Sequence, residues 1–131
     1  MRWQKKAVRA TNVTRGTLVG ECIRVAETGL TRIVGLLGER ELQPGDGLLI
    51  VPSQSIHTWG MRFPIDIAVL DHDWKVIGMR CDMRPFRITR MFWKAAAVLE
   101  LPSGTLDSTS THIGDTIEFG RVDVAVQSME K

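Results

Sequence analysis

The feature that most constrains the fold of this sequence is a series of short apolar runs, each ended by a turn. The most apolar run, 65–70, is followed by Asp71-His72-Asp73, which we expect to be a hairpin turn before a returning strand over 74–83. Pro44-Gly45-Asp46-Gly47 is another turn and precedes a strand over 48–51. Short strands separated by turns, without regular alternation of strands and helices, are typical of a β-sandwich or a partly open barrel. The pattern therefore predicts a mainly β chain of the α+β type.

About eight short strands and one amphipathic helix are expected in all. The helix lies over 28–38, where Leu30, Ile33, Val34 and Leu37 recur at i, i+3, i+4 and i+7 and form one apolar stripe. Residues 102–113 are rich in Ser and Thr, and propensity alone makes them a loop or a poor helix. The strands are expected over 17–27, 48–51, 56–61 (a strand or a loop), 65–70, 74–83, 95–101, 116–119 and 122–126.

The length of 131 residues fits one domain, which we expect over 15–128. The first fifteen residues carry five basic side chains and no acidic one, so residues 1–14 are expected to form a flexible basic arm. The net charge of the whole chain is only +2, which does not indicate a nucleic-acid-binding protein. No stretch approaches the roughly 20 apolar residues of a membrane span, and no signal peptide is recognisable. We therefore expect a cytoplasmic protein.

The two cysteines, Cys22 and Cys81, match neither a zinc pattern nor a disulfide framework. Strand alternation puts Cys81 on the same face as Ile77 and Met79, which predicts a buried free thiol. A disulfide between Cys22 and Cys81 is the alternative. The sequence also has no Gly-rich phosphate loop, paired histidines or Cys-x-x-Cys motif, so no metal site and no cofactor are predicted.

Three stretches carry a resemblance to a known family. The residues TRIVGLL at 31–37 are similar to a helix with an Arg-x-x-Gly-Leu core, and GLLIV at 47–51 is similar to a Gly-Met-Leu-Phe strand. The residues HTWGMRFPID at 57–66 are similar to a Trp/Phe-Met-x-x-x-x-Ile-x-Asp signature. Over roughly residues 20–120 the chain resembles the bacterial and archaeal family known as domain of unknown function 192.

The resemblance implies a compact, jelly-roll-like β fold and a second, short helix within 103–112. It implies no activity, because none is established for the family. Gly60 departs from the family pattern, in which many relatives carry a bulkier residue, so contacts made at this position are expected to differ. Leu48 stands where Met is usual.

The densest group of candidate binding residues is His57, Trp59, Met61, Arg62 and Asp66. Alternation puts the first three on one face of an extended segment. The indole offers a stacking surface, the guanidinium a planar set of donors and the imidazole a titratable group. Such a set can hold a sugar ring, a nucleobase or a carboxylate. The structural alternative is that Trp59 and Met61 fill the core while Arg62 pairs with Asp66.

Two further groups of polar residues are weighed against structural roles. Asp66 lies in an apolar run and needs a partner, which catalysis, backbone capping or an ion pair would each supply. Asp71-His72-Asp73 carries side chains that bind metals, but a hairpin turn is also the ordinary place for Asp.

A second basic stretch holds Arg84, Arg87 and Arg90 near Trp93. Guanidinium groups beside aromatic rings can grip single-stranded nucleic acid or another anionic polymer. The structural alternative is a solvated loop whose aromatic side chains pack into the domain.

The leading prediction is a binding or accessory module for a small molecule or a peptide, without catalytic activity. The first alternative is an interaction protein that uses the basic arm and loop against nucleic acid or an acidic partner. Tight nucleic-acid binding is not expected, since such contacts weaken steeply with salt. The second alternative is a hydrolase with His57 and Asp66 as its site, which requires the two side chains to lie within hydrogen-bond reach. The sequence does not define the oligomeric state.

Overall fold

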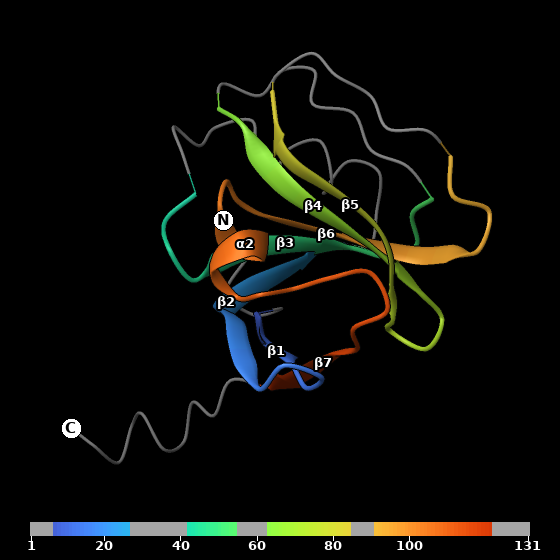
Figure 1. The fold of residues 1–131 in the computed structure, drawn as a ribbon, viewed down its shortest axis with the longest axis horizontal. Helices are drawn as coiled ribbons and strands as arrows, with labels where there is room; N and C mark the ends of the chain where they lie inside the picture. Colours follow the sequence, from blue (N-terminus) through green and yellow to red (C-terminus); the bar gives the residue numbers. More distant parts are fainter. Residues whose placement is uncertain (1–6, 27–41, 55–62, 85–90, 122–131) are drawn as a thin grey trace.

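The computed structural model describes residues 7–26, 42–54, 63–84 and 91–121 (Figure 1). In this part of the chain seven strands form one curled sheet, a half-barrel, which carries one short helix. The mainly β prediction is therefore confirmed. The elements are β1 (Val8–Asn12), β2 (Thr17–Ala26), β3 (Asp46–Ile50), β4 (Ile65–Asp71), β5 (Val76–Met83), β6 (Ala95–Pro102), α2 (Thr105–Ser108) and β7 (Ile117–Arg121).

The strands follow the order β5-β4-β6-β3-β2-β1-β7 across the sheet. The β2–β3 pair is parallel, and every other neighbouring pair is antiparallel. Lys75, just before β5, forms an isolated bridge with Thr116, just before β7. The two edge strands, β5 and β7, therefore approach each other where this bridge joins the residues that precede them. Of the two predicted architectures, this curled sheet corresponds to the partly open barrel, and the described strands do not divide into the two sheets of a jelly roll.

The middle of the sheet is covered on both faces. All six residues 65–70 of β4 are buried. The side chains of Ile65, Ile67 and Val69 belong to one apolar cluster, whereas those of Ala68 and Leu70 belong to another. Because both faces of the strand are packed, its sequence is continuously apolar instead of alternating. The prediction of a core strand here is confirmed.

The predicted flexible arm is wrong for residues 8–12, which form β1. This strand lies between β2 and β7 and pairs with both, and Ala10 and Asn12 on it are fully buried. Its partners come from residues 17–23 and 117–121, so the pairing depends on contacts that local sequence does not reveal. Residues 1–6 of the predicted arm lie outside the described residues.

The prediction that Cys81 is buried is also wrong, since both cysteines are exposed free thiols. The register of β4 on β5 shifts between Ile65–Met83 and Ile67–Arg80. Two residues of β5, Cys81 and Asp82, therefore stand opposite the single residue Asp66, which makes a β-bulge. The bulge interrupts the alternation on which the prediction for Cys81 depended.

The remaining predicted elements have mixed outcomes. The hairpin turn at 71–73 and the strand over 95–101 are confirmed, and α2 lies within the range expected for a short helix. The predicted amphipathic helix over 28–38, the strand or loop over 56–61 and the strand over 122–126 lie outside the described residues. No helix in the described part of the chain is long and apolar enough to cross a membrane.

Candidate functional site

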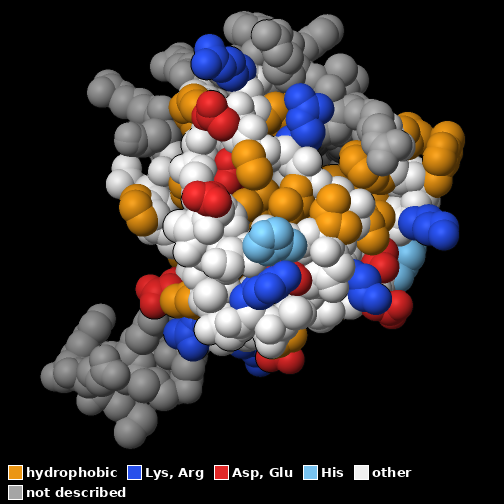
Figure 2. All heavy atoms as spheres, viewed as in Figure 1, with side chains coloured by type: hydrophobic (Ala, Val, Ile, Leu, Met, Phe, Trp, Pro, Cys, Tyr) orange, Lys and Arg blue, Asp and Glu red, His pale blue; other side chains and the backbone are white. Residues whose placement is uncertain are grey.

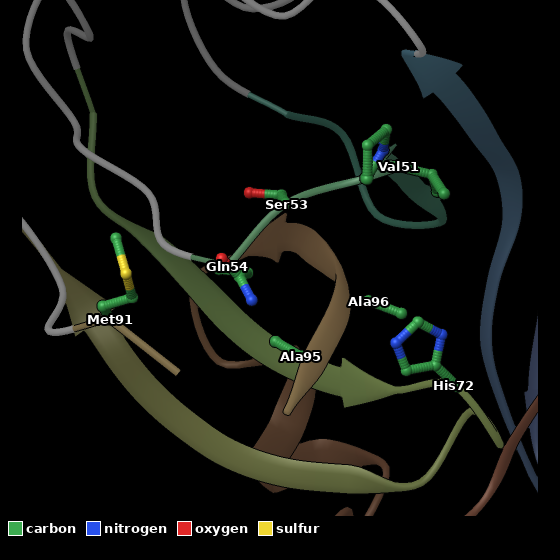
Figure 3. Close-up of a pocket in the computed structure, with 8 residues that line it drawn as sticks. Val51, Ser53, Gln54, His72, Met91, Ala95 and Ala96 are labelled. Carbon is green, nitrogen blue, oxygen red and sulfur yellow. The ribbon is translucent and has the colours of Figure 1, made fainter. Parts of the chain in front are cut away.

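An open pocket of about 610 Å³ lies where the chain leaving β3, the turn after β4 and the beginning of β6 come together. Its volume falls within the range of roughly 300–1,000 Å³ that is usual for small-molecule sites. Figure 3 shows His72 beside Ala96 at one side and Met91 at the other, with Ser53 and Gln54 between them. The described residues that line it are Val51, Pro52, Ser53, Gln54, His72, Met91, Ala95 and Ala96.

The pocket wall combines apolar side chains with a few polar ones. Ser53, Gln54 and His72 supply a hydroxyl, an amide and an imidazole, and the other lining side chains are apolar. Apolar walls with a small number of placed polar groups are the usual composition of a ligand site. The arrangement can therefore bind a small molecule by contact and hydrogen bonding.

A tight turn over residues 92–95, referred to below as the Trp93 turn, adjoins the pocket, because Ala95 at its end is one of the lining residues. Its ends join through the Ala95 N–H, which donates to the Phe92 carbonyl at 3.0 Å. Gln54 holds the turn against the wall through two further hydrogen bonds. Its carbonyl accepts from the Phe92 N–H at 2.9 Å, and its Nε2 donates to the Trp93 carbonyl at 3.0 Å.

Gly78 of β5 makes room for this turn. A Cβ atom added to Gly78 would lie 2.5 Å from Cε1 of Phe92, so the ring packs where another residue would have its side chain. The Phe92 ring is partly buried, whereas Trp93 next to it is 78% exposed. Trp93 thus has an exposed side chain on a turn whose backbone is held by hydrogen bonds.

Asp66 lies outside the pocket lining and is fully buried. Its Oδ1 accepts from the Asp82 N–H at 2.8 Å, and its Oδ2 accepts from the N–H groups of Gly104 and Leu106 at 3.1 and 2.9 Å. The carboxylate joins β4 to the bulge in β5 and to the beginning of α2. Of the roles considered for Asp66, backbone capping is the one that these contacts describe, and a substrate does not reach the carboxylate in this position.

A second buried carboxylate, Asp115, lies in a polar network with β1 and the turn that follows it. Its Oδ2 accepts from Asn12 Nδ2 at 3.0 Å, from Arg15 Nε at 3.0 Å and from the His112 N–H at 2.9 Å. Burial alone would raise the pKa of Asp115, but the hydrogen bonds and the charge of Arg15 lower this pKa from 3.8 to about 2. The residue is therefore a charged structural anchor.

The metal and thiol candidates have simpler surroundings. Asp71 Oδ1 accepts from the N–H groups of Asp73 and Lys75, both at 2.9 Å, which are ordinary turn contacts. The described residues contain no group of three or more His, Cys, Asp and Glu side chains that could hold a metal ion. At Cys81, partial burial and the nearby charges of Asp66, Asp107 and Asp82 raise the thiol pKa, which disfavours the reactive thiolate.

The structure does not test the predicted ligand segment as a whole. His57, Trp59, Met61 and Arg62 lie outside the described residues, as do Arg87 and Arg90 of the basic loop. Arg84 is exposed and engaged in an interaction. The pocket itself was missed in the sequence because its lining comes from three separate segments. One lining residue, His72, was singled out in the sequence, but as a possible metal ligand in the turn at 71–73.

A family model matches residues 10–119 of this chain, and that family is DUF192, described as an uncharacterized ACR. The chain belongs to the DUF192 family. The resemblance recognised in its sequence is therefore confirmed, and the match begins within β1, at residue 10, so the family region extends into the predicted arm. The description of DUF192 names no activity, so function must be argued from the site.

Individual relatives of this DUF192 chain support the same conclusion. A UPF0127 protein from Pyrococcus furiosus is 26% identical over 117 residues, which are 85% of this chain and 97% of the relative. A protein of unknown function from Novosphingobium aromaticivorans is 22% identical with a TM-score of 0.73, over 86% of this chain and 83% of its own. A Sinorhizobium meliloti protein with a provisional assignment as a transcription regulator is 22% identical with a TM-score of 0.72, over 86% and 91%. At these identities the two solved structures show a shared fold and nothing further.

Proposed function

We propose that this DUF192 protein is a binding module that holds a small molecule or a short peptide in the pocket beside the Trp93 turn. The observation that carries the proposal is the pocket itself, with apolar walls and polar groups from Ser53, Gln54 and His72. A rim that is already held by hydrogen bonds lowers the entropy lost when a ligand binds. The proposal includes no chemical step.

The predicted ligand residues remain part of this proposal. Gln54, in the pocket wall, stands three residues before His57 in the chain, and Met91 directly follows Arg90. The segment with His57, Trp59, Met61 and Arg62 therefore begins next to the wall in sequence. We propose that these side chains add contacts to a ligand, while Asp66 keeps the structural role that its backbone contacts describe.

The two alternative functions have less support. A hydrolase with Asp66 as base would need that carboxylate at a substrate, whereas it is fully buried and accepts three backbone hydrogen bonds. An interaction protein would use Arg84, Arg87, Arg90 and Trp93 against an anionic partner, and the provisional assignment of the S. meliloti relative suggests nucleic acid. Binding that falls steeply as salt rises would identify this alternative.

A reducing compartment such as the cytoplasm fits the proposal. Cys22 and Cys81 are both exposed and unlinked, and exposed free thiols are ordinary in proteins that stay in a reducing environment. The protein would then meet ligands of the cell interior.

The test is an NMR titration of the full chain with a library of neutral fragments, short peptides, nucleosides and sugars. We expect at least one compound to shift the amide signals of Ser53, Gln54, Ala95 and Ala96 in a saturable way. Ala96→Leu fills pocket volume from β6 and should abolish this response, whereas Glu118→Leu, at an exposed position of β7, should retain it. Absence of any saturable response at the pocket, or equal responses in the two variants, would contradict the proposal.

A further inference from the structure

The sheet has two edge strands in the described part of the chain, β5 and β7. The strand β5 is poorly suited to pairing with a further strand, because its register on β4 shifts at two places. Register shifts of this kind bend and twist an edge strand and so hinder its pairing. In contrast, β7 pairs with β1 in an unbroken register over all five of its residues. The regular edge of the sheet is therefore β7.

Alternate residues of β7 direct their backbone groups away from β1. The Ile117 N–H donates to the Trp74 carbonyl at 2.9 Å, on the side of β7 opposite to β1. By alternation, the N–H and C=O groups of Phe119 and Arg121 face the same outer side. Among the residues that the structure describes, no strand pairs with β7 on this side beyond Ile117. The backbone groups of Phe119 and Arg121 can therefore accept and donate hydrogen bonds to a further strand.

The surface at this edge is more polar than the middle of the sheet. The ribbon places β7 next to β1 at the lower side of the molecule (Figure 1). Figure 2 shows apolar side chains gathered over the middle of the same face, whereas backbone and charged side chains predominate in the lower part. Glu118, Gly120 and Arg121 are exposed, and Phe119 is partly buried. A partner at this edge would therefore be held mainly by backbone hydrogen bonds, as in strand addition.

The sequence of β7 fits a second copy of itself. In an antiparallel pair about a two-fold axis, Phe119 stands opposite Arg121 of the second copy, and Arg121 opposite its Phe119. Each of these pairs can exchange both of its backbone hydrogen bonds. Gly120 lies at the axis, where a Cβ atom would meet nothing within 4 Å, so no side chain obstructs the approach. Each guanidinium also comes beside an aromatic ring, which attracts a cation.

We propose that this chain forms a two-fold symmetric dimer by antiparallel pairing of its β7 strands, which joins the two sheets into one. A strand of five residues buries less surface than the roughly 1,200–2,000 Å² of a stable interface, so the dimer is weak and depends on protein concentration. None of the described residues that line the pocket belongs to β7, so the dimer does not depend on the proposed function.

The test combines sedimentation equilibrium with hydrogen exchange followed by NMR, on the full chain at about 50 µM and about 1 mM protein. We expect the average mass to rise toward that of a dimer. The N–H groups of Phe119 and Arg121 should exchange about threefold or more slowly at the higher concentration, because the second copy protects them. The N–H groups of Glu118 and Gly120 face β1 and serve as internal controls, since their exchange should not depend on concentration.

Arg121→Pro removes the outward N–H of this residue and no bond to β1, and proline is tolerated at a strand edge. The variant should stay monomeric at about 1 mM protein, whereas Arg121→Lys, which keeps the N–H and the charge, should dimerise like wild type. Should Arg121→Pro fail to fold, the exchange of the Phe119 N–H in wild type still decides.

Four results would overturn the dimer. The first is a wild-type protein that stays monomeric over this concentration range, and the second is association that leaves the exchange at Phe119 unchanged. The third is growth beyond a dimer, which would indicate head-to-tail pairing of β7 with β5. The fourth is a folded Arg121→Pro variant that associates like wild type.

Discussion

Asp66 and Trp93 are fixed in similar ways but face opposite environments. Backbone N–H groups from three separate residues surround the Asp66 carboxylate, which is fully buried. Hydrogen bonds from Gln54 and within the turn hold the backbone around Trp93, whose side chain is 78% exposed. The hydrogen bonds of the Asp66 carboxylate are all made within the protein, whereas the Trp93 indole is exposed to solvent on a turn that is held in place. The comparison separates a residue that maintains the fold from one that is available to a ligand.

The largest expected effect is at Asp66. Asp66→Ala leaves the N–H groups of Asp82, Gly104 and Leu106 without their acceptor, and each such loss costs roughly 1–3 kcal/mol. Because the three losses are not additive, we expect the free energy of unfolding to fall by about 3–5 kcal/mol. Urea denaturation measures the change, and Asp107→Ala, at an exposed carboxylate nearby, should stay close to wild type. An Asp66→Ala protein as stable as wild type would show that Asp66 does not maintain the fold, and so does not differ from Trp93 in this respect.

Asp115 provides a second buried carboxylate whose contribution depends on pH. Its pKa is lowered to about 2 in the folded protein, so its charge stabilises the fold above its ordinary pKa of 3.8. This contribution should disappear as the pH falls from about 4 to about 2. Asp115→Asn keeps an acceptor oxygen but removes the charge, and should cost about 1–2 kcal/mol at pH 7, since the half-exposed Arg15 partner is screened by solvent.

The measurement for Asp115 is a series of urea denaturations of wild type and Asp115→Asn between pH 7 and pH 2. The two proteins should differ most at neutral pH and converge near pH 2, because other carboxylates titrate alike in both. A difference that stays constant over this range would show that the charge of Asp115 is not the stabilising feature.

Gly78 connects the sheet to the Trp93 turn, so its substitution should affect both stability and the pocket. In Gly78→Ala the new methyl group would lie 2.5 Å from the Phe92 ring, and the ring must move. We expect a loss of about 1–2 kcal/mol together with changed NMR signals at Trp93 and Ala95. Gly120→Ala is the matched control, because a Cβ atom there meets nothing within 4 Å. Unchanged signals at Trp93 would mean that Phe92 does not position the turn.

Local chemistry made some of the fold predictable from sequence. The turn at 71–73 follows from Asp71, whose carboxylate accepts the N–H groups of Asp73 and Lys75 a few residues away. The continuous apolar run of β4 likewise indicates burial on both faces, and this can be recognised without knowing which strands lie beside it. Features that depend on residues close together in the chain could therefore be predicted from the sequence.

Long-range contacts account for what the sequence did not reveal. β1 was missed because its alternate residues Ala10 and Asn12 are small or polar, and Asn12 is buried only because Asp115 and Thr111 accept its hydrogen bonds. Cys81 was misplaced because the Asp82 N–H bonds to Asp66 at the bulge. The pocket wall joins Gln54 to Trp93 across 39 positions of sequence. A need for a partner at Asp66 could be predicted, but the identity of the partner could not.

The smallest expected change in stability is at Trp93, and its size tests whether this side chain, unlike that of Asp66, makes no contribution to the fold. Because 78% of the side chain is already in solvent, Trp93→Ala removes little buried apolar surface and should change the free energy of unfolding by less than about 0.5 kcal/mol. Leu70→Ala, at a fully buried side chain of β4, should cost about 2–5 kcal/mol in the same urea denaturation. A loss above about 1 kcal/mol for Trp93→Ala would mean that the indole supports the turn, and any change at the pocket in that variant would then reflect a displaced turn. A loss near zero would show that the turn is held by its backbone hydrogen bonds and by the Phe92 ring, and that the exposed indole does not contribute to the fold.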